Sequence, residues 1–357
     1  MNQAAPAPKR HSTKSLLIPF IIVGIGLVLW SGWWFYLTHE VKTQMASRLE
    51  RLEASGWSVK YDRIGASGWP MHARLTLYNP EIIAPSGQGI RAPYIAAEAT
   101  SYKPTHWVIA ANDGLTLIRA ERGDTNITAK AIRMSLTGLR QPWPNVSMEM
   151  VQPHFAPVEG AQPFPLADAA LVQLYMRPHI QAAGSPNGED NVDVLFRLID
   201  AHGREGGPIQ GLTQSGKLTL QVEAVIEQAS ALRKPATDQG LLAAWTASGG
   251  YFAKVRGEML AGVSHALLTS PELRAADNGQ LEGTVTFKTQ KPLAAIVGLA
   301  GSNVGLPAER AADAQAATSS PQGGQGAEGQ DIELTVSFRK GRTYLGPFPL
   351  APAPRLF

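Results

Sequence analysis

The sequence predicts a mainly β protein with minor helices (α+β), in which an N-terminal transmembrane helix is followed by a large curved antiparallel β-sheet domain. Three observations lead to this fold class. An uncharged stretch lies near the N-terminus, short runs of alternating apolar and polar residues recur along the rest of the chain, and 35 glycines and 26 prolines separate those runs. Charged residues make up only 17% of the chain. This composition is typical of many short strands joined by turns.

Chain length and composition exclude several classes of function. The 357 residues are enough for one large domain or two smaller ones. Cysteine is absent, which excludes cysteine-ligated zinc and iron–sulfur sites, disulfide frameworks and cysteine nucleophiles. The formal net charge is only +3. No cluster of Lys and Arg follows residue 14, so a nucleic-acid partner is not expected. No motif predicts a bound cofactor.

The first predicted element is a membrane span over residues 16–37, which contain no charged residue. At 1.5 Å per residue this helix would be about 33 Å long, enough for a hydrocarbon core of about 30 Å. Aromatic residues near its end are typical of the belt that lies at a membrane surface; they are Trp30, Trp33, Trp34 and Tyr36. The predicted anchor residues are Leu16, Leu17, Ile18, Phe20, Ile21, Ile22, Val23, Ile25, Leu27, Val28, Leu29, Trp30, Trp33, Trp34, Phe35 and Tyr36.

The charges around this span predict its orientation. Lys9, Arg10 and Lys14 precede it, and a basic flank stays on the cytoplasmic side of a membrane. We therefore expect residues 1–15 to form a cytoplasmic basic tail, the span to lie in the inner membrane, and the chain from Thr38 onward to lie in the periplasm. A cleaved signal peptide is the alternative. Its apolar region is usually shorter and ends in small residues, whereas this one ends in bulky aromatic residues, which favours an uncleaved signal-anchor.

The helix is predicted to continue beyond the membrane as an amphipathic helix over residues 38–56. Val41, Met45, Leu49 and Leu52 recur at helical spacing between charged residues, and a glycine follows. We expect this apolar stripe to pack on the sheet that follows. Recruitment of a partner is the alternative.

A β-rich periplasmic domain is predicted over residues 57–299, because the apolar period changes from helical to alternating at Trp57. Gly, Pro, Asn and Asp separate the later runs at short intervals, which indicates an antiparallel meander rather than βαβ units. The strands expected in the first half of the domain are residues 57–61, 73–78, 94–101, 105–110, 115–120, 127–136 and 146–153.

The second half of the domain has a less uniform pattern. The residues expected as strands are 191–201, 217–226 and 281–287, those expected as short helices are 238–248 and 292–299, and residues 166–176 fit helix or strand equally. Residues 300–330 consist largely of Ala, Ser, Gly and Gln. They are predicted to form a flexible low-complexity loop, because they bury too little apolar surface to offset the entropy of ordering. Residues 331–357 are predicted to be a C-terminal β-hairpin and Pro-rich tail of the same domain.

The closest approach to a catalytic motif is the segment from Gly211 to Lys217, which reads G-x-x-x-x-G-K. A phosphate-binding loop requires Ser or Thr next, with a strand before it and a helix after it. Leu218 stands there instead, and it begins an alternating pattern that is typical of a strand. We interpret the segment as a turn.

The titratable residues form no recognisable metal or catalytic group along the sequence. No two of the eight histidines have the i, i+3 or i, i+4 spacing that brings two imidazoles to one metal. His106 and His154 stand beside aromatic residues and are interpreted as packed or interfacial histidines. Glu189, Asp190 and Asp193 lack the glycine and terminal glutamate of a calcium loop, so they indicate a solvated turn. No G-x-S-x-G elbow is present.

Three short motifs together resemble a known protein family. They are Gly68-Trp69-Pro70 before a strand, Tyr102-Lys103-Pro104-Thr105-His106-Trp107, and the ending Gly341-Arg342-Thr343-Tyr344-Leu345-Gly346-Pro347-Phe348-Pro349-Leu350 with Pro354 behind it. With the N-terminal anchor, they resemble the bacterial family called domain of unknown function 2125, found mainly in alphaproteobacteria. The resemblance covers most of the chain after residue 40. It supplies no catalytic residues, because the family has no established activity.

The family is in turn loosely similar to AsmA-type envelope proteins, which are anchored in the inner membrane, β-rich and implicated in lipid handling and outer-membrane maintenance. The resemblance implies a non-enzymatic protein of cell-envelope lipid handling or outer-membrane homeostasis, with phospholipid or another lipid in an apolar groove. An interaction scaffold that recruits envelope proteins through sheet edges is the alternative, and an envelope hydrolase is a third reading. An apolar sheet face left open would favour lipid, and a sealed core would favour the scaffold.

Overall fold

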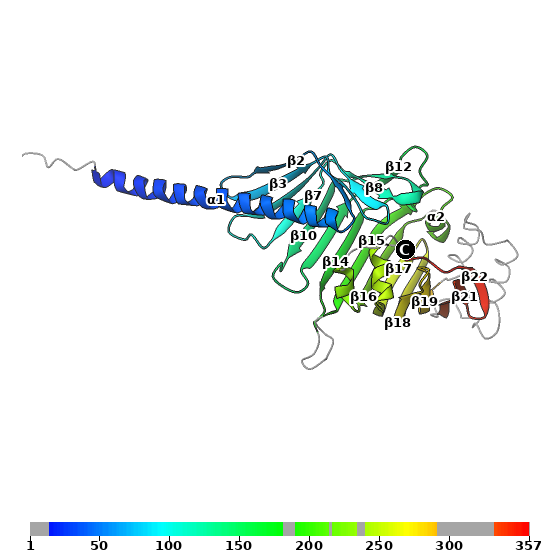
Figure 1. The fold of residues 1–357 in the computed structure, drawn as a ribbon. Coiled ribbons are helices and arrows are strands. Elements are labelled where there is room, and N and C mark those ends of the chain that lie inside the picture. The colour runs from blue at the N-terminus through cyan, green and yellow to red at the C-terminus, as the bar shows by residue number, and fades with distance from the viewer. Residues whose placement is uncertain (1–13, 181–189, 214–215, 234–239, 291–331, 357) are drawn as a thin grey trace, which may run out of the picture.

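One long helix and a large curved antiparallel sheet make up most of the structure, a computed structural model that describes residues 14–180, 190–213, 216–233, 240–290 and 332–356 (Figure 1). The predicted helix at 292–299 and the predicted loop at 300–330 lie outside these residues. The helices are α1 (Lys14–Ala54), η1 (Ala120–Arg122), α2 (Pro208–Thr213), η3 (Ala229–Arg233) and α3 (Leu241–Ala247).

The strands are β1 (Ser58–Lys60), β2 (Arg63–Ser67), β3 (His72–Tyr78), β4 (Glu81–Ile83), β5 (Gln88–Arg91), β6 (Tyr94–Thr100), β7 (Trp107–Ala110), β8 (Leu115–Arg119), β9 (Thr125–Thr128), β10 (Ala131–Thr137), β11 (Asn145–Val151), β12 (His154–Pro157), β13 (Leu166–Asp168), β14 (Leu171–Pro178), β15 (Val192–Gly203), β16 (Leu218–Ile226), β17 (Phe252–Ala261), β18 (Ser264–Ala275), β19 (Leu281–Gln290), β20 (Ile332–Arg339), β21 (Arg342–Leu345) and β22 (Phe348–Pro352). The predicted fold class is therefore confirmed.

The strands form two joined sheets in which every pairing is antiparallel. The main sheet has the order β2-β3-β6-β7-β10-β11-β14-β15-β16-β17-β18-β19-β20-β21-β22. The short-strand sheet has the order β1-β4-β5-β8-β9-β12-β13-β15 and shares β15 with the main sheet. Within the described part of the chain, β2 and β22 pair on one side only, so the main sheet is not closed.

Sharp corners carry the chain from one sheet to the other. Asn79 and Gln152 have φ values of +48° and +50°, and a fully buried proline follows each of them, Pro80 and Pro153. The left-handed residue turns the strand, and the proline has no N–H to continue the ladder. The chain also changes sheets between Thr128 and Ala131, where β9 ends and β10 begins. The single strand predicted over residues 127–136 is wrong for this reason.

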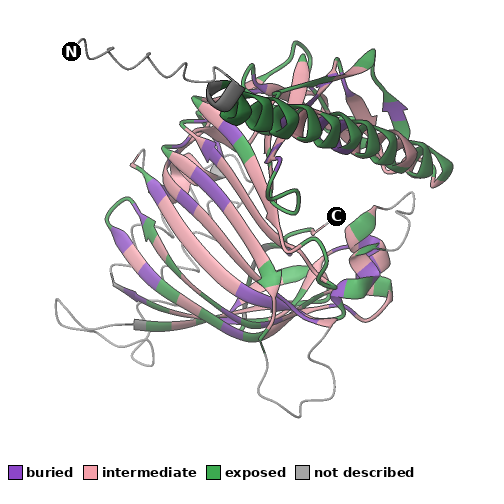
Figure 2. Cartoon of the chain, turned by 90° about the vertical axis from the view of Figure 1, so that its left-hand side faces the viewer, coloured by how far each residue is buried: buried purple, intermediate pink, exposed green. Residues whose placement is uncertain are grey.

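The main core fills the angle between the two sheets. Its buried members come from strands on both sides of the corner; they are Ala111, Ile127, Ile132, Met150, Phe155, Ala169, Val172, Leu198, Ala201, Leu218 and Ala261. Phe155 stacks on Phe164 with ring centroids 4.8 Å apart. A second core lies at the other end of the long strands, where Trp245 of α3 packs with Val192 and Ile226. Figure 2 shows the bowed main sheet with the short helices on the inner side of its curve.

The remaining sequence predictions have mixed outcomes. Residues 166–176 form strands, β13 and β14, and the helix expected at 238–248 is present as α3. The final hairpin forms and pairs along the edge of the main sheet. β17 and β18 were not predicted. In β17, Gly257 interrupts the apolar alternation, and glycine weakens a strand pattern. The segment from Gly211 to Lys217 begins inside α2, and β16 begins directly after it at Leu218. A helix before and a strand after is the reverse of the order that a phosphate-binding loop needs.

Candidate functional site

The main sheet presents an apolar face. Because residues directly opposite each other on paired strands point to the same side, the register defines one continuous line of thirteen residues across the sheet, which we call the apolar row. Its members are Ala66, Leu75, Ala97, Ile109, Met134, Met148, Leu174, Phe196, Val222, Gly257, Leu268, Phe287 and Leu334.

The residues that follow or precede these in sequence point to the opposite side of the sheet. They form a matching row that is polar except at Val108 and Leu195: Ser67, Arg74, Glu98, Val108, Ser135, Ser147, Tyr175, Leu195, Glu223, Arg256, Thr269, Thr286 and Thr335. A sheet with one polar and one apolar face needs a cover only on the apolar side.

The apolar row is incompletely covered. Ala66 is exposed, Leu75 is buried, and the other members are half-buried. The parallel line of residues nearer the corner, which includes Ile132, Val172 and Leu198, is buried in the main core. Twelve strand-to-strand steps of about 4.8 Å give the apolar row a contour length of about 58 Å. The inner face of the sheet is therefore an extended apolar surface that the described part of the chain does not seal.

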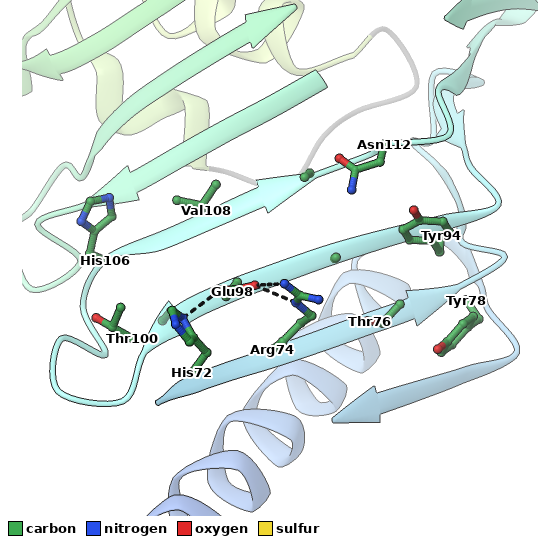
Figure 3. A pocket seen from close by; sticks show the side chains of 13 residues that line it. His72, Arg74, Thr76, Tyr78, Tyr94, Glu98, Thr100, His106, Val108 and Asn112 are labelled. Atoms are coloured by element: carbon green, nitrogen blue, oxygen red, sulfur yellow. Dashed lines mark hydrogen bonds and ion pairs between the residues drawn. The ribbon is translucent and has the colours of Figure 1, made fainter. Parts of the chain in front are cut away.

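Helix α1 covers the first strands of this face. Trp34 and Leu37 are buried on the helix, and Ala73 and Leu77 are buried on β3. Figure 3 shows α1 behind these strands, with the polar side chains of β3 and β6 on the near side. The amphipathic stripe of Val41, Met45, Leu49 and Leu52 is half-buried, and α1 contacts β1, β2 and β3. The prediction that this stripe packs on the sheet is confirmed.

Hydrogen bonds attach α1 to the turn between β2 and β3. The indole Nε1 of Trp30 donates to the carbonyl oxygen of Pro70 over 2.8 Å, and that of Trp34 donates to the carbonyl oxygen of His72 over 2.6 Å. The indole Nε1 of Trp69 donates in the other direction, to Ser31 Oγ over 3.1 Å. Gly68 makes this turn with φ +102°, and a Cβ there would lie 2.7 Å from the carbonyl oxygen of His72, so only glycine fits.

The predicted anchor residues divide into two groups. Trp34 is buried and Trp30 is half-buried against the domain, so these two members of the expected aromatic belt contact protein. The backbone of Leu16 belongs to α1. The remaining predicted residues are exposed; they are Leu17, Ile18, Phe20, Ile21, Ile22, Val23, Ile25, Leu27, Val28, Leu29, Trp33, Phe35 and Tyr36. The helix is long and apolar enough to span a bilayer, and it projects away from the sheet (Figure 1).

A shallow depression of about 610 Å³ lies on the polar face over β3, β6 and β7 (Figure 3). Its centre is Glu98, whose carboxylate accepts a hydrogen bond from Arg74 Nε over 2.7 Å and pairs with His72 Nδ1 at 2.8 Å. At its end, His106 Nε2 lies 3.2 Å from Ser135 Oγ. A nucleophilic serine also needs oxyanion donors and a group that orients the histidine. Ser135 lies within a strand paired on both sides, and no such orienting group is recorded among the described residues.

A second depression, of about 940 Å³, lies farther along the polar face. Arg177 and His179 both bind Asp193 there. Asp190 instead accepts hydrogen bonds from the backbone N–H and the hydroxyl of Ser230, over 2.6 and 2.8 Å. Asp190 and Asp193 therefore bind different partners and do not form one acidic cluster. Glu189 lies outside the described residues.

The other titratable side chains do not converge. No group of three or more His, Asp and Glu in the described residues is placed to hold a metal ion. His106 and His154 were interpreted as packed or interfacial histidines. The packed alternative is wrong, because both side chains are exposed, and the interfacial alternative stays a prediction. His154 occupies the outward position on β12 while Phe155 takes the inward one, and His106 lies in the turn before Trp107.

Three carboxylates of the described strands have lowered pKa values: Glu81, Glu149 and Glu272. Arg133 and Gln173 donate hydrogen bonds to Glu149 and lower its pKa below 4.5, against a smaller opposing effect of burial. Arg91 and Lys60 lower the pKa of Glu81 in the same way. A carboxylate with a lowered folded-state pKa stabilises the fold above its unfolded-state pKa, and this contribution is lost as the pH falls through the folded-state value.

The Glu149→Gln variant should therefore lose a contribution that depends on pH. We expect the free energy of unfolding to fall by less than about 1 kcal/mol at pH 7, because Arg133 is solvent-exposed and the pair is partly screened. The difference from the parent chain should shrink as the pH falls below about 4.5. Chemical denaturation at several pH values measures it, with Glu333→Gln as the control at an exposed carboxylate. A difference that is constant with pH would contradict this cause.

Comparison with known proteins supports one assignment. No curated protein and no solved structure matches the chain. The sequence model of one family, described as "uncharacterized protein conserved in bacteria (DUF2125)", matches residues 34–354. The matched region begins at Trp34, which is buried against β3, and contains every strand of both sheets. The resemblance seen in the sequence motifs is confirmed, and the chain belongs to this DUF2125 family of uncharacterized bacterial proteins.

Proposed function

We propose that this protein is a non-enzymatic, membrane-anchored protein of the cell envelope that handles lipid on the apolar face of its main sheet. In this proposal α1 crosses the inner membrane with the basic N-terminus in the cytoplasm, and both sheets lie in the periplasm. The lipid is a phospholipid or another molecule with acyl chains, and it lies along the apolar row.

The open apolar row is the observation that supports this function best. A half-buried methylene group still gains part of the roughly 0.8 kcal/mol that full burial provides, so half-burial of a chain of about fifteen methylenes gives roughly 6 kcal/mol before entropic costs. The apolar row, about 58 Å long, exceeds the bilayer hydrocarbon core of about 30 Å, so any single acyl chain fits along it.

The position of α1 also supports the proposal. The helix covers the apolar face at β2 and β3, and the row continues from there over eleven further strands, the last of which is β20. A lipid that left the bilayer beside α1 would therefore meet the beginning of the row first. The depressions on the opposite face have mixed linings, in which charged side chains such as Glu98 and Asp193 stand beside apolar ones such as Val108.

A photo-crosslinking experiment tests the proposal. A photoreactive benzophenone amino acid replaces Phe196 in the apolar row, or the neighbouring Leu195, which points to the polar side of the same strand. After irradiation of cells that produce the full chain, we expect lipid adducts on the protein with the probe at 196 and none with the probe at 195. Mass spectrometry of the purified protein identifies the adduct.

A charged substitution gives the second arm of the experiment. Val222 lies opposite Phe196 in the apolar row, so Val222→Asp should reduce the adduct at 196 by placing a charge against the acyl chain. Circular dichroism checks that the sheet remains folded. Absence of lipid at 196, or equal labelling at 195 and 196, would contradict lipid handling on this face. Protein adducts at 196 instead would favour the interaction scaffold.

A further inference from the structure

The membrane-proximal tip of the domain consists of two adjacent turns: residues 68–71, between β2 and β3, and residues 101–106, between β6 and β7. The two turns are bonded to each other, since the backbone N–H of Ser101 donates to the carbonyl oxygen of Met71 over 2.9 Å. The tip is also bonded to α1 through Trp30, Ser31 and Trp34. The height of the tip along the helix is therefore fixed at residues 30–34.

The length of the apolar segment then determines how far the tip stands from the membrane. Lys14 is the last charged residue before the segment, and fifteen residues separate it from Trp30, which corresponds to about 23 Å of helix. A hydrocarbon core is about 30 Å thick, so the helix must continue about 7 Å past Trp30 to cross it. Tilt of the helix would increase this shortfall. The tip is therefore drawn to the level of the lipids.

The side chains at the tip suit this position. Trp69, Met71 and Tyr102 are 49%, 56% and 66% exposed, so three large side chains are exposed together on two adjacent turns. On the neighbouring part of α1, Trp33 and Tyr36 are 45% and 62% exposed. Aromatic side chains with one polar group prefer the boundary between headgroups and acyl chains.

The charges at the tip also favour contact with a membrane surface. Neither turn contains an acidic residue, and the exposed Lys103 and His106 lie in the second turn. A lysine near the surface of an anionic membrane is attracted to it. The nearest carboxylate on these strands, Glu98, is already bound by Arg74 and His72.

We propose that this tip inserts into the interfacial layer of the same bilayer that α1 crosses, with Trp69, Met71 and Tyr102 at the depth of the glycerol backbone. The inference rests on the membrane span of the proposed function and adds a fixed depth for the domain. It also places Ala66, the first member of the apolar row, two residues before the turn at 68–71 that enters the lipid.

Single-cysteine labelling tests the depth, since the chain contains no cysteine of its own. Met71→Cys and Tyr102→Cys report on the tip, and both side chains are exposed, so neither change opens a cavity. Val23→Cys reports on the span. Val263→Cys is the matched control: Val263 is 67% exposed and lies in the turn between β17 and β18, eight strands from β3, or about 38 Å along the sheet.

Each full-length variant carries an environment-sensitive fluorophore and is placed in vesicles of phosphatidylcholine and phosphatidylglycerol. Some vesicles contain lipids brominated close to the headgroup, and others contain lipids brominated deep in the chain. We expect the labels at 71 and 102 to lose emission with the shallow bromine, the label at 23 with the deep bromine, and the label at 263 with neither.

Two outcomes would overturn the inference, and they differ. If the labels at 71 and 102 behave as the label at 263 does while that at 23 is quenched, the anchor stands and the tip is not inserted. If the label at 23 is not quenched either, the membrane span fails and the inserted tip fails with it.

Discussion

Replacement of Trp245 by alanine is expected to lower the free energy of unfolding by about 3–5 kcal/mol. Trp245 is only 1% exposed, and its indole Nε1 donates to the carbonyl oxygen of Glu227 over 2.9 Å. Its ring lies 4.9 Å from that of Phe252, and it holds α3 against β15 and β16. The substitution leaves a large cavity and also an unpaired carbonyl, and each of these is destabilising. Denaturant titration of the full chain measures the change.

Trp245→Phe separates the two causes. The phenyl ring retains most of the buried volume but cannot donate to Glu227, so we expect a loss near 1 kcal/mol from the hydrogen bond and a further small loss from the missing volume. The backbone of Gly250 packs directly against the indole of Trp245, because a Cβ at this glycine would lie 2.1 Å from Trp245 Nε1. If Trp245→Ala left the stability unchanged, α3 would contribute nothing to the cooperative fold.

Two arginines in the projecting half of α1 are expected to remove the protein from the membrane. Ile22 and Ile25 are 64% and 56% exposed, as lipid-facing side chains would be. Each change from isoleucine to arginine near the centre of a span raises the free energy of membrane insertion by about 3–4 kcal/mol. Ile22→Arg with Ile25→Arg therefore raises it by roughly 7 kcal/mol. The double variant should leave the membrane fraction, and its C-terminal domain should remain in the cytoplasm.

A reporter enzyme that works only outside the cytoplasm, fused to the C-terminus, reads out both effects. The parent chain should show activity and the Ile22→Arg, Ile25→Arg variant should not. Thr43→Arg with Gln44→Arg is the matched control, since both residues are exposed on the same helix beyond the attachment to the sheet. Retention of the control in the membrane with an active reporter is expected. A parent chain active only with a cytoplasmic reporter would reverse the proposed topology.

The proposed membrane span and the proposed lipid binding on the apolar row both depend on helix α1. In the proposal its projecting part contacts lipid. Its second half contacts β2 and β3 and leaves the rest of the apolar row open. Because Trp30 and Trp34 bind backbone oxygens of the β2–β3 turn, the orientation of the sheet follows that of the span. In the proposed arrangement this coupling holds the open apolar face beside the membrane, where apolar surface finds lipid partners.

Local patterns in the sequence were sufficient to predict most of the elements, although not β17 and β18. An uninterrupted apolar segment predicts the projecting helix, and the spacing of Val41, Met45, Leu49 and Leu52 predicts which side of its continuation is covered, because helical periodicity depends only on near neighbours. Alternation likewise predicted most strands and which of their residues share a face. The family assignment followed from short glycine and proline motifs.

Tertiary structure alone decided how these elements combine. The alternation of one strand says nothing about its register with the next, so the alignment of thirteen apolar residues into one row depends on pairings between residues far apart in sequence. The corners at Asn79 and Gln152 likewise depend on packing between two sheets. Trp30 and Trp34 lie at the end of an apolar segment, where the sequence predicts aromatic residues that face lipid. In the structure they instead bind a turn about forty residues away. Burial is a property of the partner as well as of the residue, and a partner distant in sequence leaves no local pattern.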